Sequence, residues 1–318
     1  MSQSTSAGDP AAKPAEQRPP RIDVDGVLLL DKPLGLSSND ALVRAKRLLN
    51  AKKAGHTGTL DPLATGLLPL CFGEATKFSQ GLLDADKTYE AQVLLGVKTA
   101  SGDAEGDVLQ TRPVQCTVEQ VRAALAAFTG EIDQVPPMYS ALKKDGKPLY
   151  AYARAGETVE REARRVRIHE IDLLALELPT LRIRVRCSKG TYIRTLAEDI
   201  GEHLGCGAHL TALRRTAVGA LRLEDALTLE RLDAAEPAGR AALLAPVDAL
   251  VADLPRIDLD AVLEGRFRQG QRLAQAPGVD ALRDAQIIDL VRVYGPGGAL
   301  LGVAQLRDGV LRPQRLVR

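Results

Sequence analysis

Hydrophobic and polar residues alternate strictly over residues 181–187, where Leu, Ile, Val and Cys are separated by three arginines. Such alternation predicts a strand that is buried on one side and solvent-facing on the other. Residues 27–30 and 89–95 are also predicted as strands, and Asp31, Lys32 and Pro33 should end the first of them. These strands predict at least one sheet with a buried face.

Apolar residues spaced by three or four predict helices. They cover residues 40–49, 75–82 and 193–204, and a further helix lies between Thr117 and Gly130. Ser37 or Ser38 should cap the first helix, and Thr117 with Gln120 forms a capping box for the last one named. Strands and helices follow one another without regular βαβ alternation, which favours an α+β fold over a dinucleotide-binding fold.

The pattern changes near residue 250. Short strands are predicted at 289–293, 300–306 and 310–311, with Gly-Pro and Asp-Gly turns between them that are typical of hairpins. The first residues are rich in Ser, Ala, Pro and Gln and lack an apolar core, so we expect disorder there. We therefore predict a disordered tail at 1–22, a main domain at 23–249 and a small β-rich domain at 250–318.

Composition narrows the class of protein. Lys and Arg (42) nearly balance Asp and Glu (41), so any nucleic-acid binding must come from local patches. The four cysteines form no CxxC pair, which indicates a reducing compartment. No apolar run approaches the roughly 20 residues of a membrane helix. We expect a cytoplasmic protein that does not bind a membrane, and no motif calls for a nucleotide, metal or redox cofactor.

Residues 55–66, GHTGTLDPLATG, form a Gly-rich segment with one His and one Asp. Asp61 lies between Leu60 and Pro62, where water is scarce. A carboxylate in that setting is either a turn cap or a nucleophile. On these residues alone, a turn cap is the more common role for Asp61, and a loop histidine is the more common role for His56.

Two further groups of residues carry candidate chemistry. In residues 188–194, Lys189, Tyr192 and Arg194 converge at the start of a predicted helix. A cation is unfavourable in the first turn of a helix, so Arg194 is expected to serve a carboxylate or a phosphate. Basic and aromatic residues also interleave on predicted loops, a composition that suits RNA. They are Lys143, Lys144, Lys147, Arg161, Arg164, Arg165 and Arg167, with Tyr139, Tyr150 and Tyr152.

These motifs, taken in order, resemble those of the TruB-type pseudouridine synthases. The matching segments are residues 26–33, 37–40, 55–66, 87–89, 137–143, 190–194, 205–210 and 213–215. The resemblance extends from about residue 23 to the end and is strongest from 26 to 215. Several ordered motifs are far more specific than any single one.

The resemblance implies an α+β catalytic domain on a mixed, mostly antiparallel sheet, followed by a PUA-like C-terminal domain that binds RNA. It also implies isomerisation of uridine 55 in the TΨC loop of tRNA to pseudouridine, by base flipping and attack of a catalytic aspartate. Asp61 matches that aspartate, and Arg194 matches the arginine that pairs with it. His56, Tyr89, Tyr192, Leu213 and Lys32 match substrate-binding positions.

The expected partner is the T-arm stem-loop of tRNA. We expect no guide RNA and no protein partner, and we expect a monomer. Attack of Asp61 at C1′ of the ribose and attack at C6 of the uracil both remain open. Two other functions also remain: a non-catalytic RNA-binding protein, and a glycosidase, for which Asp103 is only a weak candidate as the second carboxylate.

Overall fold

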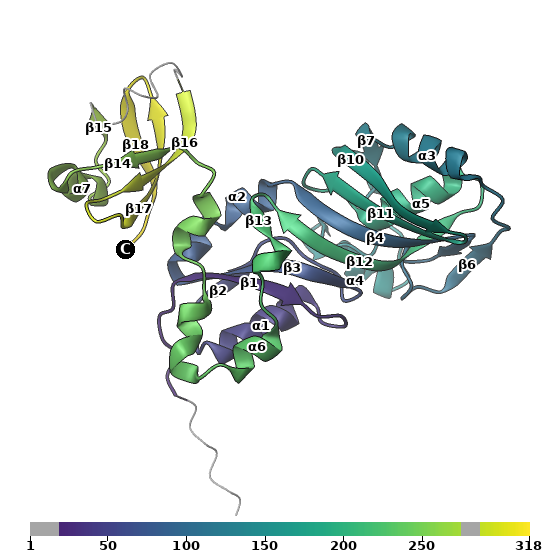
Figure 1. Cartoon of the computed structure of the whole chain (residues 1–318), viewed down its shortest axis with the longest axis horizontal. Coiled ribbons are helices and arrows are strands. Elements are labelled where there is room, and N and C mark those ends of the chain that lie inside the picture. The colour runs from purple at the N-terminus through teal and green to yellow at the C-terminus, as the bar shows by residue number, and fades with distance from the viewer. Residues whose placement is uncertain (1–18, 275–286) are drawn as a thin grey trace, which may run out of the picture.

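A nine-stranded sheet forms the centre of the fold (Figure 1). The computed structural model describes residues 19–274 and 287–318. The strand order is β1 (Gly26–Lys32), β3 (Ala64–Phe72), β12 (Ala208–Val218), β4 (Lys87–Leu95), β11 (Thr180–Cys187), β10 (Arg164–Glu177) and β7 (Gly130–Gln134). Two short strands flank this path: β2 (Ala54–His56) pairs with β3, and β13 (Leu221–Arg222) pairs with β12.

The β3–β12 pair is the parallel one in this sheet, and its other pairs are antiparallel. The predicted α+β class with a mixed, mostly antiparallel sheet is thus confirmed. Arg215 of β12 lies opposite both Gly66 of β3 and Tyr89 of β4. This junction of three strands brings together segments that are distant in the sequence, and the candidate site lies beside it.

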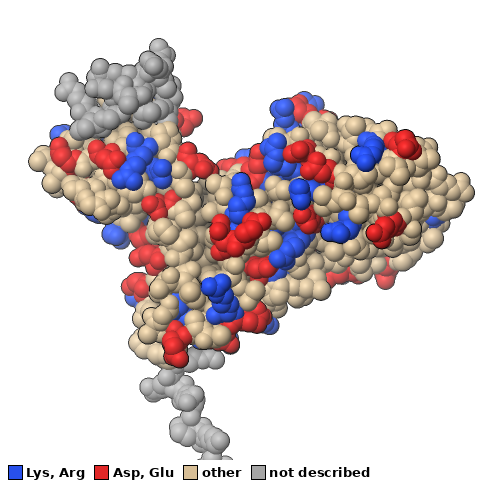
Figure 2. Space-filling model, viewed as in Figure 1, with Lys and Arg blue, Asp and Glu red and all other residues tan. Residues whose placement is uncertain are grey.

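The alternation predicted for β11 is present, with its apolar residues buried and Arg182, Arg184 and Arg186 exposed. Acidic residues on neighbouring strands face these arginines, with Arg184 lying 3.3 Å from Glu90. Exposed pairs of this kind contribute only about 0–1 kcal/mol each. Their main effect is to neutralise the outer face, and Figure 2 likewise shows acidic and basic side chains intermixed over the visible surface.

Helices cover the buried face of the sheet and its β1 end (Figure 1). The helices of the first domain are α1 (Ser38–Leu48), α2 (Ser79–Asp84), α3 (Val118–Ala127), α4 (Leu149–Arg154), α5 (Ile193–His203) and α6 (Leu229–Ala234). Helix α5 packs on β12 and β4, and α1 packs on α6 and β2. The predicted caps are confirmed: Ser37 accepts from the Asp40 amide, and Thr117 and Gln120 form the reciprocal capping box.

The single helix predicted at 75–82 is wrong. The segment forms a 3₁₀ helix, η1 (Gly73–Lys77), and then α2, with Phe78 in a non-helical conformation between them. The hydroxyls of Thr76 and Ser79 donate to the carbonyls of Gly73 and Thr76, respectively. Such local bonds compete with helical hydrogen bonding and interrupt the helix.

Strands β3, β7, β10 and β12 were not predicted. Strand β3 is buried along nearly its whole length, so it shows a continuous apolar run and no alternation. Strand β10 contains register shifts near Ile168 and Leu173, which disturb its period. Further short strands are β5 (Val97–Thr99), β6 (Val108–Thr111), β8 (Lys143–Lys144) and β9 (Lys147–Pro148).

A second sheet follows, with its own core around Phe267 and Leu301. Its order is β14 (Arg256–Asp258), β16 (Ile287–Tyr294), β17 (Leu300–Arg307), β18 (Val310–Leu316) and β15 (Leu273–Ala274), with α7 (Ala261–Arg268) beside it. The three predicted strands are present and longer than expected. Residues Val247–Val251 (η4) still pack on the first domain, so the chain enters the second sheet just after the predicted boundary at 250.

Two other expectations concern the whole chain. Most of the predicted tail at 1–22 lies outside the described residues, although the Ile22 amide donates to Asn50 and its carbonyl accepts from Lys52. Within residues 19–274 and 287–318, no helix combines the length and apolarity needed to cross a membrane.

We predict that Gly66→Ala destabilises the protein by about 3 kcal/mol or more. Gly66 has φ +97°, and a Cβ there would collide with the backbone of Arg215 on β12. Gly156→Ala is the matched control, because Gly156 has φ +74° but open space around it. That variant should lose only about 1 kcal/mol, from backbone strain. Urea unfolding followed by circular dichroism measures both, and equal losses would show that the strand contact is unimportant.

Candidate active site

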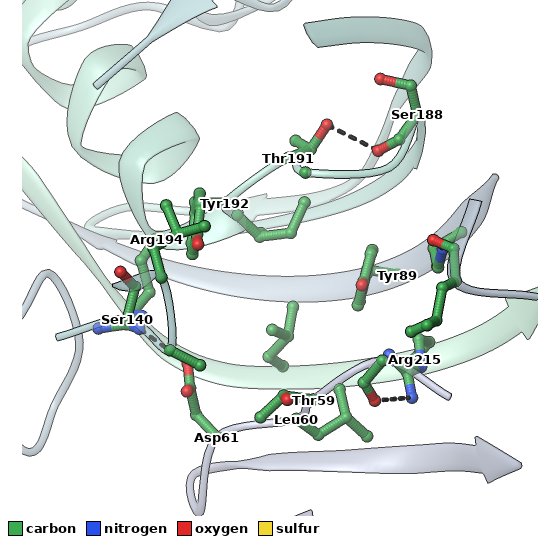
Figure 3. Close-up of a pocket in the computed structure, with 18 residues that line it drawn as sticks. Thr59, Leu60, Asp61, Tyr89, Ser140, Ser188, Thr191, Tyr192, Arg194 and Arg215 are labelled. Carbon is green, nitrogen blue, oxygen red and sulfur yellow. Dashed lines mark hydrogen bonds and ion pairs between the residues drawn. The ribbon is translucent and has the colours of Figure 1, made fainter. Parts of the chain in front are cut away.

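A pocket of about 330 Å³ opens over the inner face of β4 and β12 (Figure 3). One wall is the loop carrying Asp61, another is the segment 140–142, and a third is the turn before α5. Five of the seven residues predicted for the site line this pocket: Asp61, Tyr89, Tyr192, Arg194 and Leu213. The structure therefore brings together side chains from four separate parts of the sequence.

Asp61 and Arg194 form an ion pair at one end of the pocket, with 3.0 Å between Nη2 and Oδ2 (Figure 3). Arg194 is in the first turn of α5, as expected, and its side chain is only 5% exposed. Its guanidinium also donates to the carbonyls of Ser101 and Tyr139, at 2.9 and 2.6 Å. The arginine is thus fixed from several sides, and it fixes the carboxylate in turn.

A second carboxylate contacts the same guanidinium. Asp103 Oδ2 lies 3.5 Å from Arg194 Nη1, and its side chain is 4% exposed. The other oxygen of Asp103 accepts from the Ser101 hydroxyl and the Glu105 amide. Arg194 therefore balances two carboxylates, one deeply buried and one, Asp61, with 42% of its side chain exposed. Only Asp61 is open to a ligand in the pocket.

Opposing influences set the acidity of Asp61. Burial raises the pKa of the Asp61 carboxyl, the positive charge of Arg194 opposes that rise, and the negative charge of Asp103 adds to it. The net pKa is above the ordinary aspartate value. A carboxylate that is partly desolvated yet still ionised is a stronger nucleophile than one in bulk water.

The loop carrying Asp61 is held by its backbone. The Ser38 hydroxyl bonds to both the amide and the carbonyl of Leu60, at 2.7 and 3.0 Å. The carbonyls of Asp61 and Pro62 accept from Ala64 and Gly35. Among the described residues, no backbone amide donates to the Asp61 carboxylate, so the turn-cap alternative for its side chain finds no support.

Aromatic and apolar side chains line the rest of the pocket. Tyr89 projects from β4, Leu213 from β12, and Tyr192 immediately precedes α5. Gln134 fixes the backbone of Tyr192 by accepting from its amide and donating to its carbonyl. The pocket thus offers two rings and a leucine beside a carboxylate, which suits a flat, partly polar ring.

The two remaining predicted residues do not line the pocket. Lys32 is fully buried and donates to the carbonyls of Pro33 and Leu36 at 2.9 and 2.6 Å. Burial lowers the pKa of Lys32 to about 8, although Asp61 acts in the opposite direction. His56 ends β2, and its Nδ1 is buried without a hydrogen-bond partner. Burial lowers the pKa of His56, which favours a neutral ring.

The expectation that the basic and aromatic run lies on loops is wrong in part. Lys143, Lys144 and Lys147 belong to the β8–β9 hairpin, Tyr150 and Tyr152 to α4, and Arg164, Arg165 and Arg167 to β10. Residues of the run also contact one another. The Tyr152 hydroxyl donates to the Lys144 carbonyl, and Lys147 Nζ lies 4.2 Å from the centroid of the Tyr152 ring. The short hairpin and helix have too few residues to show a period.

Two further residues of this site, Arg215 and Ser140, were not predicted from the sequence. Arg215 lines the pocket while its side chain is almost fully buried, and Ser140 lies opposite Tyr192. Neither has a local signal beyond its motif. Within the part of the chain that the structure describes, no group of three or more His, Cys, Asp or Glu side chains is arranged to hold a metal ion.

We predict opposite pKa shifts of Asp61 in two variants. Arg194→Gln should raise the Asp61 pKa further, because the ionised form loses its partner, whereas Asp103→Asn should lower it by removing a negative charge. Carboxyl ¹³C NMR titration, assigned with Asp61→Asn, measures both shifts. Arg184→Gln, on the outer face of the sheet, is the control and should leave the pKa unchanged. A shift in the same direction for both variants would contradict the proposed electrostatics. Because Arg194→Gln leaves Asp103 unpaired, thermal melting must first show that this variant is folded.

Comparison with known families agrees with this geometry. Residues 46–193 match the TruB family pseudouridylate synthase N-terminal domain. Residues 194–252 match the tRNA pseudouridylate synthase B C-terminal domain, and 255–317 match the C-terminal domain of pseudouridine synthase II TruB. Together these matches extend over nearly the whole described chain.

Similar proteins and structures point the same way. A protein named tRNA pseudouridine synthase B from Ralstonia pickettii is 68% identical, with 96% of this chain and 98% of that protein covered. A protein of the same name from Cupriavidus metallidurans is 66% identical, with 95% of this chain and 98% of that protein covered.

Among solved structures, a Cbf5-Nop10-Gar1 complex contains a chain that is 26% identical, with 96% of this chain and 92% of that chain covered and a TM-score of 0.70. An H/ACA RNP bound to a substrate RNA containing 2′-deoxyuridine has a chain of the same fold, at 24% identity, coverage of 95% and 92%, and a TM-score of 0.69. The chain therefore belongs to the TruB family of pseudouridine synthases.

Proposed function

We propose that this protein isomerises uridine 55 in the TΨC loop of tRNA to pseudouridine, with Asp61 as the nucleophile. The observation that carries the proposal is the Asp61–Arg194 ion pair, which presents one accessible carboxylate beside the rings of Tyr89 and Tyr192. The name shared by the full-length relatives supports a tRNA substrate.

The chemistry fits the residues available. A base inside a folded RNA loop must be flipped out before an enzyme can reach its glycosidic bond. In our proposal the Tyr89 ring stacks on the flipped uracil, while Tyr192 and Leu213 close the pocket around it. Asp61 then attacks either C1′ of the ribose or C6 of the uracil. The base turns and rejoins the ribose through C5, so no atom is gained or lost.

Recognition of the T-arm would involve residues around the pocket. Lys189 and the basic run of 143–167 can neutralise phosphates, and we propose that His56 contacts the RNA loop beside the Asp61 segment. Since Lys32 is buried, we propose that it supports the turn at 33–36 rather than touching RNA. We further propose that the protein acts as a cytoplasmic monomer, without a guide RNA, cofactor or protein partner.

The glycosidase alternative is less consistent with the geometry. A retaining glycosidase needs a second carboxylic acid that reaches the leaving group. The carboxylate nearest to that role is Asp103, whose side chain is buried and bound by Arg194 and Ser101. This arrangement supports a role of Asp103 in holding Arg194.

The decisive test is tritium release from tRNA transcripts labelled at C5 of uridine. Wild-type protein should release tritium from an elongator tRNA without added metal or nucleotide, and Asp61→Asn should release none while still binding the tRNA. A transcript with cytidine at position 55 is the matched control and should release none. Release from the cytidine-55 transcript would move the target to another uridine. Tight binding with no release by wild type would instead favour a non-catalytic RNA-binding protein.

Tyr89 variants test the stacking role. Tyr89→Phe keeps the ring and should retain much more activity than Tyr89→Leu, since base–aromatic stacking contributes roughly 1–3 kcal/mol. Single-turnover tritium release measures the difference, with tRNA affinity measured in parallel by filter binding. Equal activity of wild type and both variants would argue against stacking on Tyr89.

A further inference from the structure

Arg215 is a buried cation at the floor of the pocket. Its side chain is 1% exposed, its Nε donates to the Leu67 carbonyl at 2.7 Å, and its Nη2 donates to the Gly58 carbonyl at 3.3 Å. Figure 3 shows Arg215 near Tyr89, at the end of the pocket away from Asp61 and Arg194. It thereby joins β12, β3 and the loop that carries Asp61.

None of the ion pairs found between described residues involves Arg215, and the two bonds above go to neutral carbonyls. The charge of Arg215 also affects neighbouring groups. Burial lowers the pKa of Lys87 to about 8 and lowers the pKa of His56, and in both cases the positive charge of Arg215 is the second contribution in the same direction. A buried charge without an opposite partner is costly and rare. Packing alone would be served as well by an apolar side chain, so the cation calls for a functional reason.

That reason lies in the side chain opposite. Arg215 and Tyr89 are direct cross-strand neighbours in the β12–β4 pair, and both line the pocket. Burial raises the pKa of Tyr89, and the positive charge of Arg215 opposes that rise, so the guanidinium lies close enough to act on the hydroxyl. A guanidinium can only donate, so in a hydrogen bond between these two side chains the Tyr89 oxygen would be the acceptor. The single proton of the Tyr89 hydroxyl would then point away from Arg215, toward the pocket that both residues line.

We propose that Arg215 is a positioning residue that holds and polarises the Tyr89 hydroxyl as a hydrogen-bond donor to the flipped uracil. This inference rests on the proposed function. It gives Tyr89 two separate roles. Its ring stacks on the base, and its hydroxyl stabilises, by a hydrogen bond, the negative charge that the base acquires. Arg215 itself does not touch the substrate.

The reaction explains why such a donor is useful. When the C1′–N1 bond breaks, its electron pair passes to the uracil, and the negative charge spreads over N1, O2 and O4. In the C1′ route, Asp61 bonds to C1′ as N1 leaves. After the base has turned, C5 bonds to C1′ and displaces the Asp61 carboxylate, the C5 proton leaves to solvent, and N1 gains a proton. The uracil is neutral before cleavage and anionic after it. A donor backed by a buried cation therefore binds the transition state more strongly than the ground state.

A double-mutant cycle tests the coupling. Arg215→Gln should lower the single-turnover rate of tritium release by about 10- to 100-fold while leaving tRNA affinity within about threefold of wild type. In a Tyr89→Phe background, the same substitution should cost less than about threefold, because the hydroxyl is already absent. Arg184→Gln, an exposed arginine on the outer face of the sheet, should leave the rate unchanged in both backgrounds.

The opposite result is an equal loss on Arg215→Gln in both backgrounds, which would mean that Arg215 acts independently of the hydroxyl. If Arg215→Gln fails to fold, Arg215→Lys replaces it, since lysine keeps the charge. The lysine variant must then lose more rate in the wild-type background than in the Tyr89→Phe background, or the inference is overturned. Absence of release by the wild-type protein would instead overturn the proposed function, so the two failures are distinguishable.

Discussion

The site depends on one buried guanidinium. Arg194 contacts Asp61, Asp103 and the carbonyls of Ser101 and Tyr139, and in doing so it connects α5 to three loops. Each contact compensates part of the cost of burying its charge, and no single one would suffice. The helix dipole opposes a cation at this position. The arginine is therefore held by its partners, and the position of Asp61 follows from theirs.

Much of the fold could be predicted because short local patterns in the sequence indicate its strands, helix caps and turns. The alternation in residues 181–187, the caps at Ser37 and Thr117, and the turn residues of the C-terminal sheet each have a direct physical cause within a few positions. The strands that were missed lack such a pattern. Strand β3 is covered on both faces, and β10 and β12 contain bulges, so none of these three strands shows a clean period of two.

The residues of the site likewise fall into two groups, those that sequence motifs predicted and those that only the tertiary structure shows. The resemblance of ordered motifs pointed to Asp61, Arg194 and the rings of Tyr89 and Tyr192, and the structure brings all four to one pocket. No local pattern distinguishes Asp103 from an ordinary turn residue or Arg215 from a surface cation. Their importance comes from tertiary burial and from partners on distant strands, which a single sequence does not reveal.

The parallel pairing of β3 with β12 also affects when, during folding, the active site can form. The Arg215–Leu67 hydrogen bond joins residues 148 positions apart, so a long loop must close before it forms. Closing such a loop carries an entropic cost, and non-local pairing slows folding. On a ribosome, the pocket can be completed only after β12 has emerged. Activity would therefore arise in one late step, and a nascent chain that ends before β12 would hold Asp61 without the strand that completes its surroundings.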